Sequence, residues 1–259
     1  EIPAVGDPRR DGVLADMSLS RTGMGISIWL SNAYIQMMTP TNKLCAKMAL
    51  PHERTLKNLR FMAMHMLAHP RKSSWGGHGS LGLEQPDELI PPYSADGRKA
   101  MYLVHFSDAT PGSLVAKGVT GGITMLAGGC IAATSQRHHL ADPGSHGSEV
   151  VAAGNNLNTL TPINGLLQEL RIRLGKTTPF YLDSQTTVFV ATKDQAVKNS
   201  VWLLRRVAVL TDAVKNGEIL PIHIKDPDMV ADAWTKYLVH QVWVKHIRYA
   251  MNVSEGDDT

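Results

Sequence analysis

The sequence predicts a layered α/β fold, in which a mixed five-stranded sheet carries helices on both faces and is preceded by a small helical module. Three observations predict it. Short apolar segments of strand length alternate with longer segments whose apolar residues recur at helical spacing. The first three strands follow one another with short glycine-containing turns, which indicates antiparallel pairing. A stretch rich in glycine and proline, residues 73–99, predicts a linker or long surface loop and so a domain boundary.

The chain before this boundary is expected to be an arm followed by helices. Residues 1–22 contain Pro3, Gly6, Pro8 and several charges without period, so we expect an extended arm there. Residues 23–72 form the predicted helical module. Its apolar residues have helical spacing over 23–38 and again after Pro51, and a turn at 39–42 followed by a short helix at 43–50 is expected between them.

Residues 100–259 are predicted to form the α/β domain. The five expected strands are Ala100–Phe106, Gly118–Leu126, Gly129–Ala133, Thr178–Leu182 and Ile219–Ile224. Helical spacing predicts helices at 147–160, 163–174, 186–192, 201–214, 229–238 and 241–251. Strands that alternate with helices in this way are typical of a sheet covered by helices.

The composition is that of an ordinary globular protein and excludes few functions. Of the 259 residues, 43% are hydrophobic and 19% charged, and the formal net charge of +3 permits nucleic-acid binding without demanding it. No apolar run approaches the roughly 20 residues of a membrane helix, so no membrane span is expected. Cys45 and Cys130 occur without a Cys-x-x-Cys pair, which favours a reducing intracellular compartment such as cytoplasm, nucleus or organelle matrix.

Four acids occupy positions that suggest a common site. Asp108 and Asp183 each follow an apolar strand, Glu149 opens the helix after the third strand, and Asp232 lies near the start of a late helix. If the first and fourth strands are neighbours, the two strand-end carboxylates meet at one sheet edge. Clustered carboxylates stay ionised only beside cations, and Mg²⁺ prefers oxygen ligands. Each acid alone is more often a turn, cap or helix-dipole residue, so the prediction depends on all four together.

Four motifs in order along the chain carry a family resemblance. They are Phe106-Ser-Asp108-Ala, Gly118-Val-Thr-Gly-Gly-Ile-Thr-Met-Leu, Tyr181-Leu-Asp183-Ser-Gln and Val230-Ala-Asp232-Ala-Trp-Thr-Lys-Tyr-Leu. With them, the chain resembles the ribonuclease H domain, with the tail of the reverse transcriptase, of copia-type retrotransposon polyproteins. A weaker match covers the helical module, at Ile28-Trp-Leu-Ser-Asn and His52-Glu-Arg-Thr-Leu.

The resemblance implies an RNase H-like fold, Mg²⁺ dependence and cleavage of RNA in RNA–DNA hybrids. It makes Asp108 and Asp183 metal ligands, Glu149 a shared ligand that orients the substrate, and Asp232 the holder of a second ion. A hybrid would lie along a basic face, although runs of basic residues are usually only solvated. The residues proposed for that face are Lys193, Lys198, Arg205, Arg206 and Lys236.

Departures from the family pattern favour a second interpretation. The acidic helix motif is reduced to Ser145-His-Gly-Ser-Glu149, Trp202 stands where the family has a histidine, and the polymerase core is not in this sequence. The alternative is a domesticated, non-catalytic structural or RNA-binding subunit of a large assembly, such as an organellar ribonucleoprotein, with other protein subunits as partners and no cofactor. Acids that lie far apart or are paired with Lys or Arg would favour this alternative.

Overall fold

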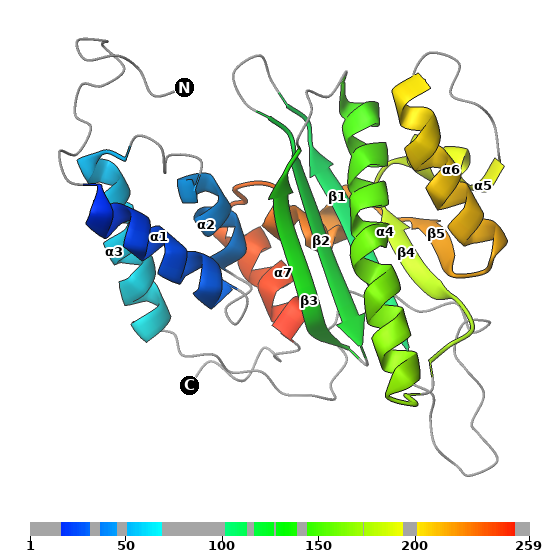
Figure 1. Cartoon of the computed structure of the whole chain (residues 1–259), viewed down its shortest axis with the longest axis horizontal. Helices are drawn as coiled ribbons and strands as arrows, with labels where there is room; N and C mark the ends of the chain where they lie inside the picture. Colours follow the sequence, from blue (N-terminus) through cyan, green and yellow to red (C-terminus); the bar gives the residue numbers. More distant parts are fainter. Residues whose placement is uncertain are drawn as a thin grey trace. The chain divides into compact units, whose positions relative to one another are not determined.

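The computed structural model describes residues 17–31, 37–45, 51–68, 102–112, 117–126, 128–138, 144–172, 174–193 and 201–251. The chain divides into two compact units, residues 1–72 and 73–259 (Figure 1). The predicted linker at 73–99 and most of the predicted arm lie outside the described residues, so both stay predictions.

The first unit is helical. It contains α1 (Ser18–Ser31), α2 (Met38–Cys45) and α3 (Glu53–Ala68). Its core consists of Met24, Met37, Leu44, Leu59 and Met62.

Two predicted boundaries in this unit are wrong. Helix α1 begins at Ser18, so residues 18–22 are helical rather than part of an arm. The predicted turn at 39–42 lies inside α2, where Thr39 and Thr41 are buried. Tertiary burial overrides the local turn signal here, because a proline in the first turn of a helix breaks no hydrogen bond.

The second unit contains a mixed sheet with the strand order β3-β2-β1-β4-β5. Strands β1, β2 and β3 pair antiparallel, whereas β4 pairs parallel with both β1 and β5. The predicted fold class is confirmed. The first and fourth strands are neighbours, which is the condition under which Asp108 and Asp183 were expected to meet. The strands are β1 (Leu103–Thr110), β2 (Val119–Leu126), β3 (Gly129–Arg137), β4 (Thr178–Leu182) and β5 (Ile219–His223).

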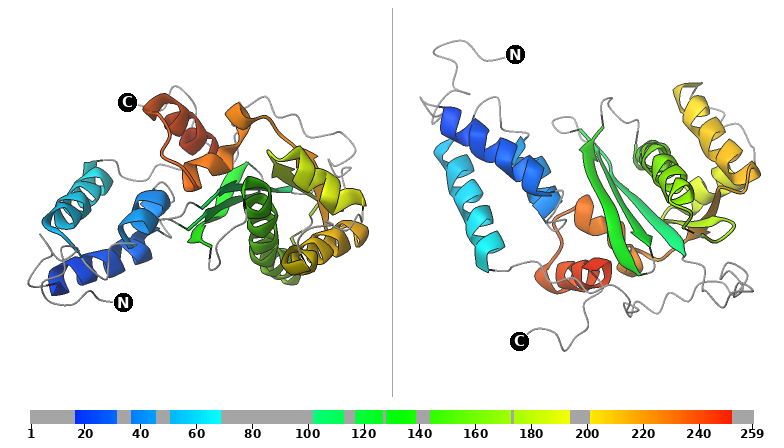
Figure 2. Two further views of the ribbon diagram at one scale, coloured as in Figure 1. Left: turned by 90° about the horizontal axis from the view of Figure 1, so that it is seen from above. Right: turned by 60° about the horizontal axis from the view of Figure 1, so that its bottom comes forward.

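Helices cover both faces of this sheet (Figure 2). On one face lie α4 (Ser145–Glu169), α5 (Gln185–Lys193) and α6 (Val201–Lys215). On the other lie the short 3₁₀ helix η5 (Val230–Trp234) and α7 (His240–Met251), preceded by the 3₁₀ turn η4 (Asp226–Asp228). None of the helices in the described ranges is both long enough and apolar enough to cross a membrane.

Two helix predictions in this unit are wrong. Helix α4 is continuous where two helices were predicted on either side of residues 161–162. Its Pro162 is exposed, so the helix tolerates the proline on its solvent side. The segment predicted as a helix at 229–238 is the five-residue η5, which ends at Trp234.

Alternation along β1 assigns its residues to opposite faces of the sheet. His105 stacks on Phe180, which belongs to the core beneath α4, α5 and α6. Phe106 lies edge-on to Tyr249 of α7, at 6.1 Å between ring centroids. Because side chains alternate along a strand, Asp108 follows Phe106 onto the face of η5 and α7.

Candidate metal centre at the sheet edge

Three of the predicted acids meet at one edge of the sheet. Asp108 lies near the end of β1, Asp183 directly follows β4, and Glu149 lies one turn into α4. One carboxylate oxygen from each lies within 4.8 Å of the others. The parallel pairing of Ser107 with Leu182 explains the meeting, because it makes the next residues of the two strands neighbours.

Burial makes the negative charge of this cluster costly. Asp108 is fully buried and Glu149 is 9% exposed. Burial, with the nearby charges of Asp108 and Asp183 adding to it, raises the pKa of Glu149 to about 10. Burial and the charge of Asp232 raise the pKa of Asp108 well above its ordinary value. Burial also raises the pKa of Asp183, against the opposing charge of Lys236. A divalent cation would favour the ionised form of all three.

The free oxygens of the cluster fit such a cation. Within the described part of the chain, nothing donates a hydrogen bond to Oδ1 of Asp108 or Oε2 of Glu149, and both atoms are buried. Buried polar atoms without partners are uncommon in folded proteins, and a bound ion is one of the explanations for them. Carboxylate oxygens are the ligands that Mg²⁺, Mn²⁺ and Ca²⁺ prefer. These residues therefore suit a hard divalent cation.

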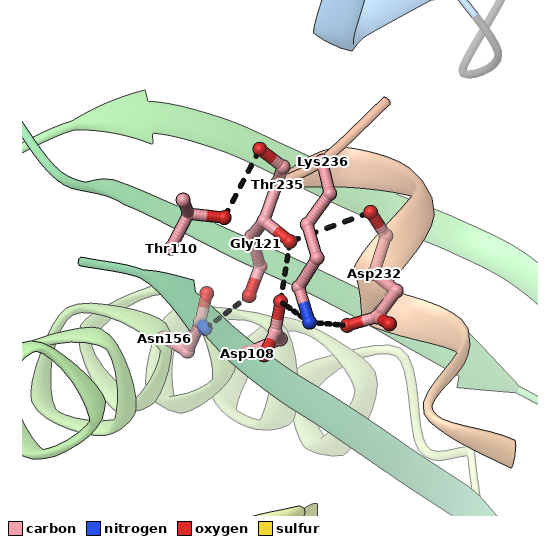
Figure 3. Close-up of polar contacts among 7 residues, drawn as sticks. All are labelled: Asp108, Thr110, Gly121, Asn156, Asp232, Thr235 and Lys236. Carbon is pink, nitrogen blue, oxygen red and sulfur yellow. Dashed lines mark hydrogen bonds and ion pairs between the residues drawn. The ribbon is translucent and has the colours of Figure 1, made fainter. Parts of the chain in front are cut away.

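The fourth acid, Asp232, has a lysine as its partner (Figure 3). The amine Nζ of Lys236 lies 2.6 Å from Oδ1 of Asp232, and 3.7 Å from Oδ2 of Asp108. Burial lowers the pKa of Lys236, but the charge of Asp108 and the bond with Asp232 outweigh it, so this pKa lies above its ordinary value. The lysine is therefore charged at neutral pH and links Asp232 to the cluster.

A threonine of the same segment orients the central acid. The Thr235 hydroxyl donates a hydrogen bond to Oδ2 of Asp108. The backbone of this segment is fixed to the sheet, because Ser135 donates to the carbonyl of Trp234 at 2.7 Å and Thr110 to that of Thr235 at 3.2 Å. Asp232 of η5 and the two residues after η5, Thr235 and Lys236, thus bring a carboxylate, a hydroxyl and an ammonium group together beside Asp108.

Two adjacent glycines of β2 let elements approach from opposite faces of the sheet. A Cβ on Gly121, the ladder partner of Asp108, would lie 2.9 Å from the carbonyl oxygen of Ala231 and closer still to the Thr235 methyl. A Cβ on Gly122 would collide with Asn156 of α4. The side-chain nitrogen of Asn156 donates to the hydroxyl of Ser107 and the carbonyl of Gly121, each at 2.8 Å, and so fixes α4 to both strands.

The residues proposed for a basic face lie on separate elements. Lys193 is exposed at the end of α5, with its amine 5.1 Å from the ring centre of Phe189. Arg205 is exposed on α6, whereas the aliphatic stem of Arg206 packs near Gly154 of α4. Lys236 lies at the carboxylates, and Lys198 is outside the described residues. A contact of any of them with nucleic acid stays a prediction.

Thr235 and Lys236 contact the acids but were not predicted to do so, although the sequence contained signals for both. Asp232 and Lys236 are four residues apart, the spacing at which opposite charges pair on one helical face. Thr235 and Lys236 stand in the same quoted motif as Asp232. The role of Asn156 had no such signal, because its partners lie on two strands far away in the sequence.

The solved structures that match this chain are distant from it in sequence. No protein-family model and no curated protein matches the chain. The N-terminal RNase H domain of a Mycobacterium tuberculosis protein, solved as a fusion with maltose-binding protein, is 12% identical over 58% of this chain and 99% of its own, with a TM-score of 0.42. RNase H1 of the archaeon Halobacterium salinarum is 14% identical over 52% and 94%, with a TM-score of 0.41.

A third solved structure is LC11-RNase H1 from a compost metagenome in complex with an RNA/DNA hybrid. It is 14% identical over 52% of this chain and 93% of its own, with a TM-score of 0.41. Independently of these matches, this chain's own strand order and strand directions form the mixed five-stranded sheet of an RNase H-like fold.

Proposed function

We propose that this protein is an RNase H-type phosphodiesterase that depends on a divalent metal and cleaves the RNA strand of RNA–DNA hybrids. One observation carries the proposal: Asp108, Glu149 and Asp183 place carboxylate oxygens within 4.8 Å of one another at the edge of an RNase H-like sheet. The motif resemblance supports an origin in a copia-type retrotransposon polyprotein, with Mg²⁺ as the ion and residues 100–259 as the catalytic domain.

The three acids have different roles in the proposed site, because their burial and positions differ. A bound Mg²⁺ would supply an activated water and neutralise charge that develops on the phosphodiester. Asp108 is buried and held by Thr235, so it fixes the position of the site. Glu149 closes the site from the α4 side. Asp183 is half-buried and follows the strand end, so it leaves one side of the cluster open to a phosphate group. Exposed Lys193 and Arg205 are the proposed contacts to the sugar–phosphate backbone of the hybrid.

The test is hydrolysis of labelled substrates with Mg²⁺. The wild type should cut an RNA–DNA hybrid and leave RNA–RNA and DNA–DNA duplexes of the same sequence intact. Asp108→Asn should lower the rate by about 10² or more, because it removes a charged group of the centre. Asp212→Asn, a change at an exposed acid of α6, is the matched control and should cut at the wild-type rate. Wild-type hydrolysis no faster than that of Asp108→Asn contradicts the proposal.

One observation favours a second candidate, a non-catalytic subunit that binds RNA. The Lys236 amine already neutralises Asp232 and lies near Asp108, as expected for acids kept for structure. This candidate predicts that the wild type and Asp108→Asn shift a labelled RNA or hybrid equally in a gel and that neither cuts it. Cleavage by the wild type alone rejects it.

A further inference from the structure

We propose that Lys236 is a built-in cation of this centre, whose ammonium group takes the place of a second divalent ion. The centre then binds one divalent ion, through Asp108, Glu149 and Asp183, and Asp232 serves the lysine rather than a metal. The inference rests on the proposed function only in requiring that these three acids bind a metal.

The two oxygens of Asp108 have different surroundings. Oδ2 accepts the Thr235 hydroxyl and has the Lys236 amine at 3.7 Å. Oδ1 is buried and, among the described residues, has no hydrogen-bond partner. A carboxylate that bridges two ions about 3.5–4 Å apart offers one oxygen to each. Only one oxygen of Asp108 remains for a metal, so this residue can bind one ion without losing its contacts to the segment after η5.

The fourth acid is also occupied. Lys236 Nζ lies 2.6 Å from Oδ1 of Asp232, so the two groups form a close ion pair. A divalent ion bound by Asp232 would have to displace this ammonium group and would meet its positive charge at close range.

The chain holds the ammonium group in place. Lys236 follows Thr235, whose hydroxyl and carbonyl are both bonded to β1, at Asp108 and Thr110. The lysine side chain is 36% exposed, and its amine reaches the carboxylates of Asp108 and Asp232. Because Lys236 is part of the chain, its ammonium group has a high effective concentration at the site, and an ion from solution must compete with it.

The test is the number of Mn²⁺ or Mg²⁺ ions that the full chain binds, measured by calorimetry. The wild type should bind about one ion per chain, and Lys236→Gln about two, because Asp232 and Oδ2 of Asp108 then lack their cation. Lys236→Arg keeps the charge and should bind one. Lys245→Gln is the matched control: it removes another lysine–aspartate pair, with Asp228 at 3.1 Å, away from the cluster, and should also bind one.

Asp232→Asn keeps the inference testable if Lys236→Gln does not fold. Because Asp232 is not a metal ligand in the wild type, Asp232→Asn alone should leave the stoichiometry at one. Where Lys236→Gln does fold, adding Asp232→Asn to it should return two to one. Two ions in the wild type, or unchanged stoichiometry and affinity in Lys236→Gln, overturns the inference and leaves the proposed function standing. A wild type that binds no ion overturns the metal centre itself.

Discussion

Asp108 has no exposed surface, and its two oxygens meet different parts of the molecule. One is bonded to Thr235, which fixes its direction, and the other has no partner among the described residues. Burying an ionised carboxyl without compensation is costly enough that it usually takes up a proton instead. The raised pKa of Asp108 expresses this cost. The buried carboxyl group of Asp108 stabilises the fold only when it binds a cation or a proton, as expected for a metal ligand.

His105 gives a pH dependence that is separate from the metal centre. It is buried in the sheet, with Nδ1 2.9 Å from the Thr124 hydroxyl, and burial lowers its pKa to about 3. The folded state therefore takes up the proton only at a lower pH than the unfolded state does. The stability that depends on neutral His105 is fully present above the unfolded pKa of about 6.5 and is lost as the pH falls toward 3.

We therefore expect His105→Gln to flatten the acid side of the stability curve. Between pH 6.5 and 5, the wild type should lose up to about 1.4 kcal/mol per pH unit more than the variant, in urea unfolding at each pH. His223→Gln, at an exposed position on β5, should keep the wild-type dependence. Parallel curves for the wild type and His105→Gln would show that His105 does not titrate as its burial requires.

At the scale of elements, the contact of β2 with η5 holds the site together. The segment after η5 reaches Asp108 only because Gly121 has no side chain. Gly121→Ala should push this segment away, cost about 1–3 kcal/mol of stability through overpacking, and lower hybrid cleavage. Gly165→Ala is the control. It lies in α4 with open space around the added methyl group, and should stabilise by up to about 1 kcal/mol.

Thermal unfolding and cleavage rates of both glycine variants measure the effect. If Gly121→Ala is as stable and active as Gly165→Ala, then the close approach of η5 does not position Asp108, and the proposed role of Thr235 fails with it.

The sequence predicted the strands better than the helices, for a physical reason. Strands carry local signals, since the apolar run before Asp183 is visible in the sequence and matches β4. The signal at Asp108 was misleading about the strand end, because β1 continues through Asp108 to Thr110 where Phe106 was predicted as the last residue. Helix limits depend on tertiary packing. Pro162 looks like a helix end but is exposed on a continuous α4, and the apolar residues of η5 look like an α-helix although they form a 3₁₀ turn packed on the sheet.

The candidate site was predictable in its acids and not in their partners. Asp108 and Asp183 were expected to meet if the first and fourth strands were neighbours, and β1 and β4 are paired in the sheet. Lys236 was assigned to nucleic acid from its charge alone, and its pairing with Asp232 and Asp108 depends on how η5 turns. Such pairings depend on side-chain geometry that charge and periodicity do not contain.

At the scale of the whole molecule, the two units have separate cores. The helical unit packs around Met24 and Leu59, and the α/β unit around residues of its sheet, α4, α5 and α6. All four acids belong to the second unit. We predict that residues 100–259 alone fold with the circular dichroism expected of an α/β domain and keep the metal affinity of the full chain. A fragment that is unfolded, or folded without metal binding, contradicts this domain division.

The central claim is that the acids at the edge of the sheet form a working metal centre. Asp183 tests it most directly, because this residue is only half-buried and its replacement by Asn should not unfold the protein. The decisive measurement is the single-turnover rate at which wild type and Asp183→Asn cleave an RNA–DNA hybrid at saturating Mg²⁺. We predict a fall of about 10² or more. Equal rates in the two proteins, or no cleavage by either, would contradict the claim.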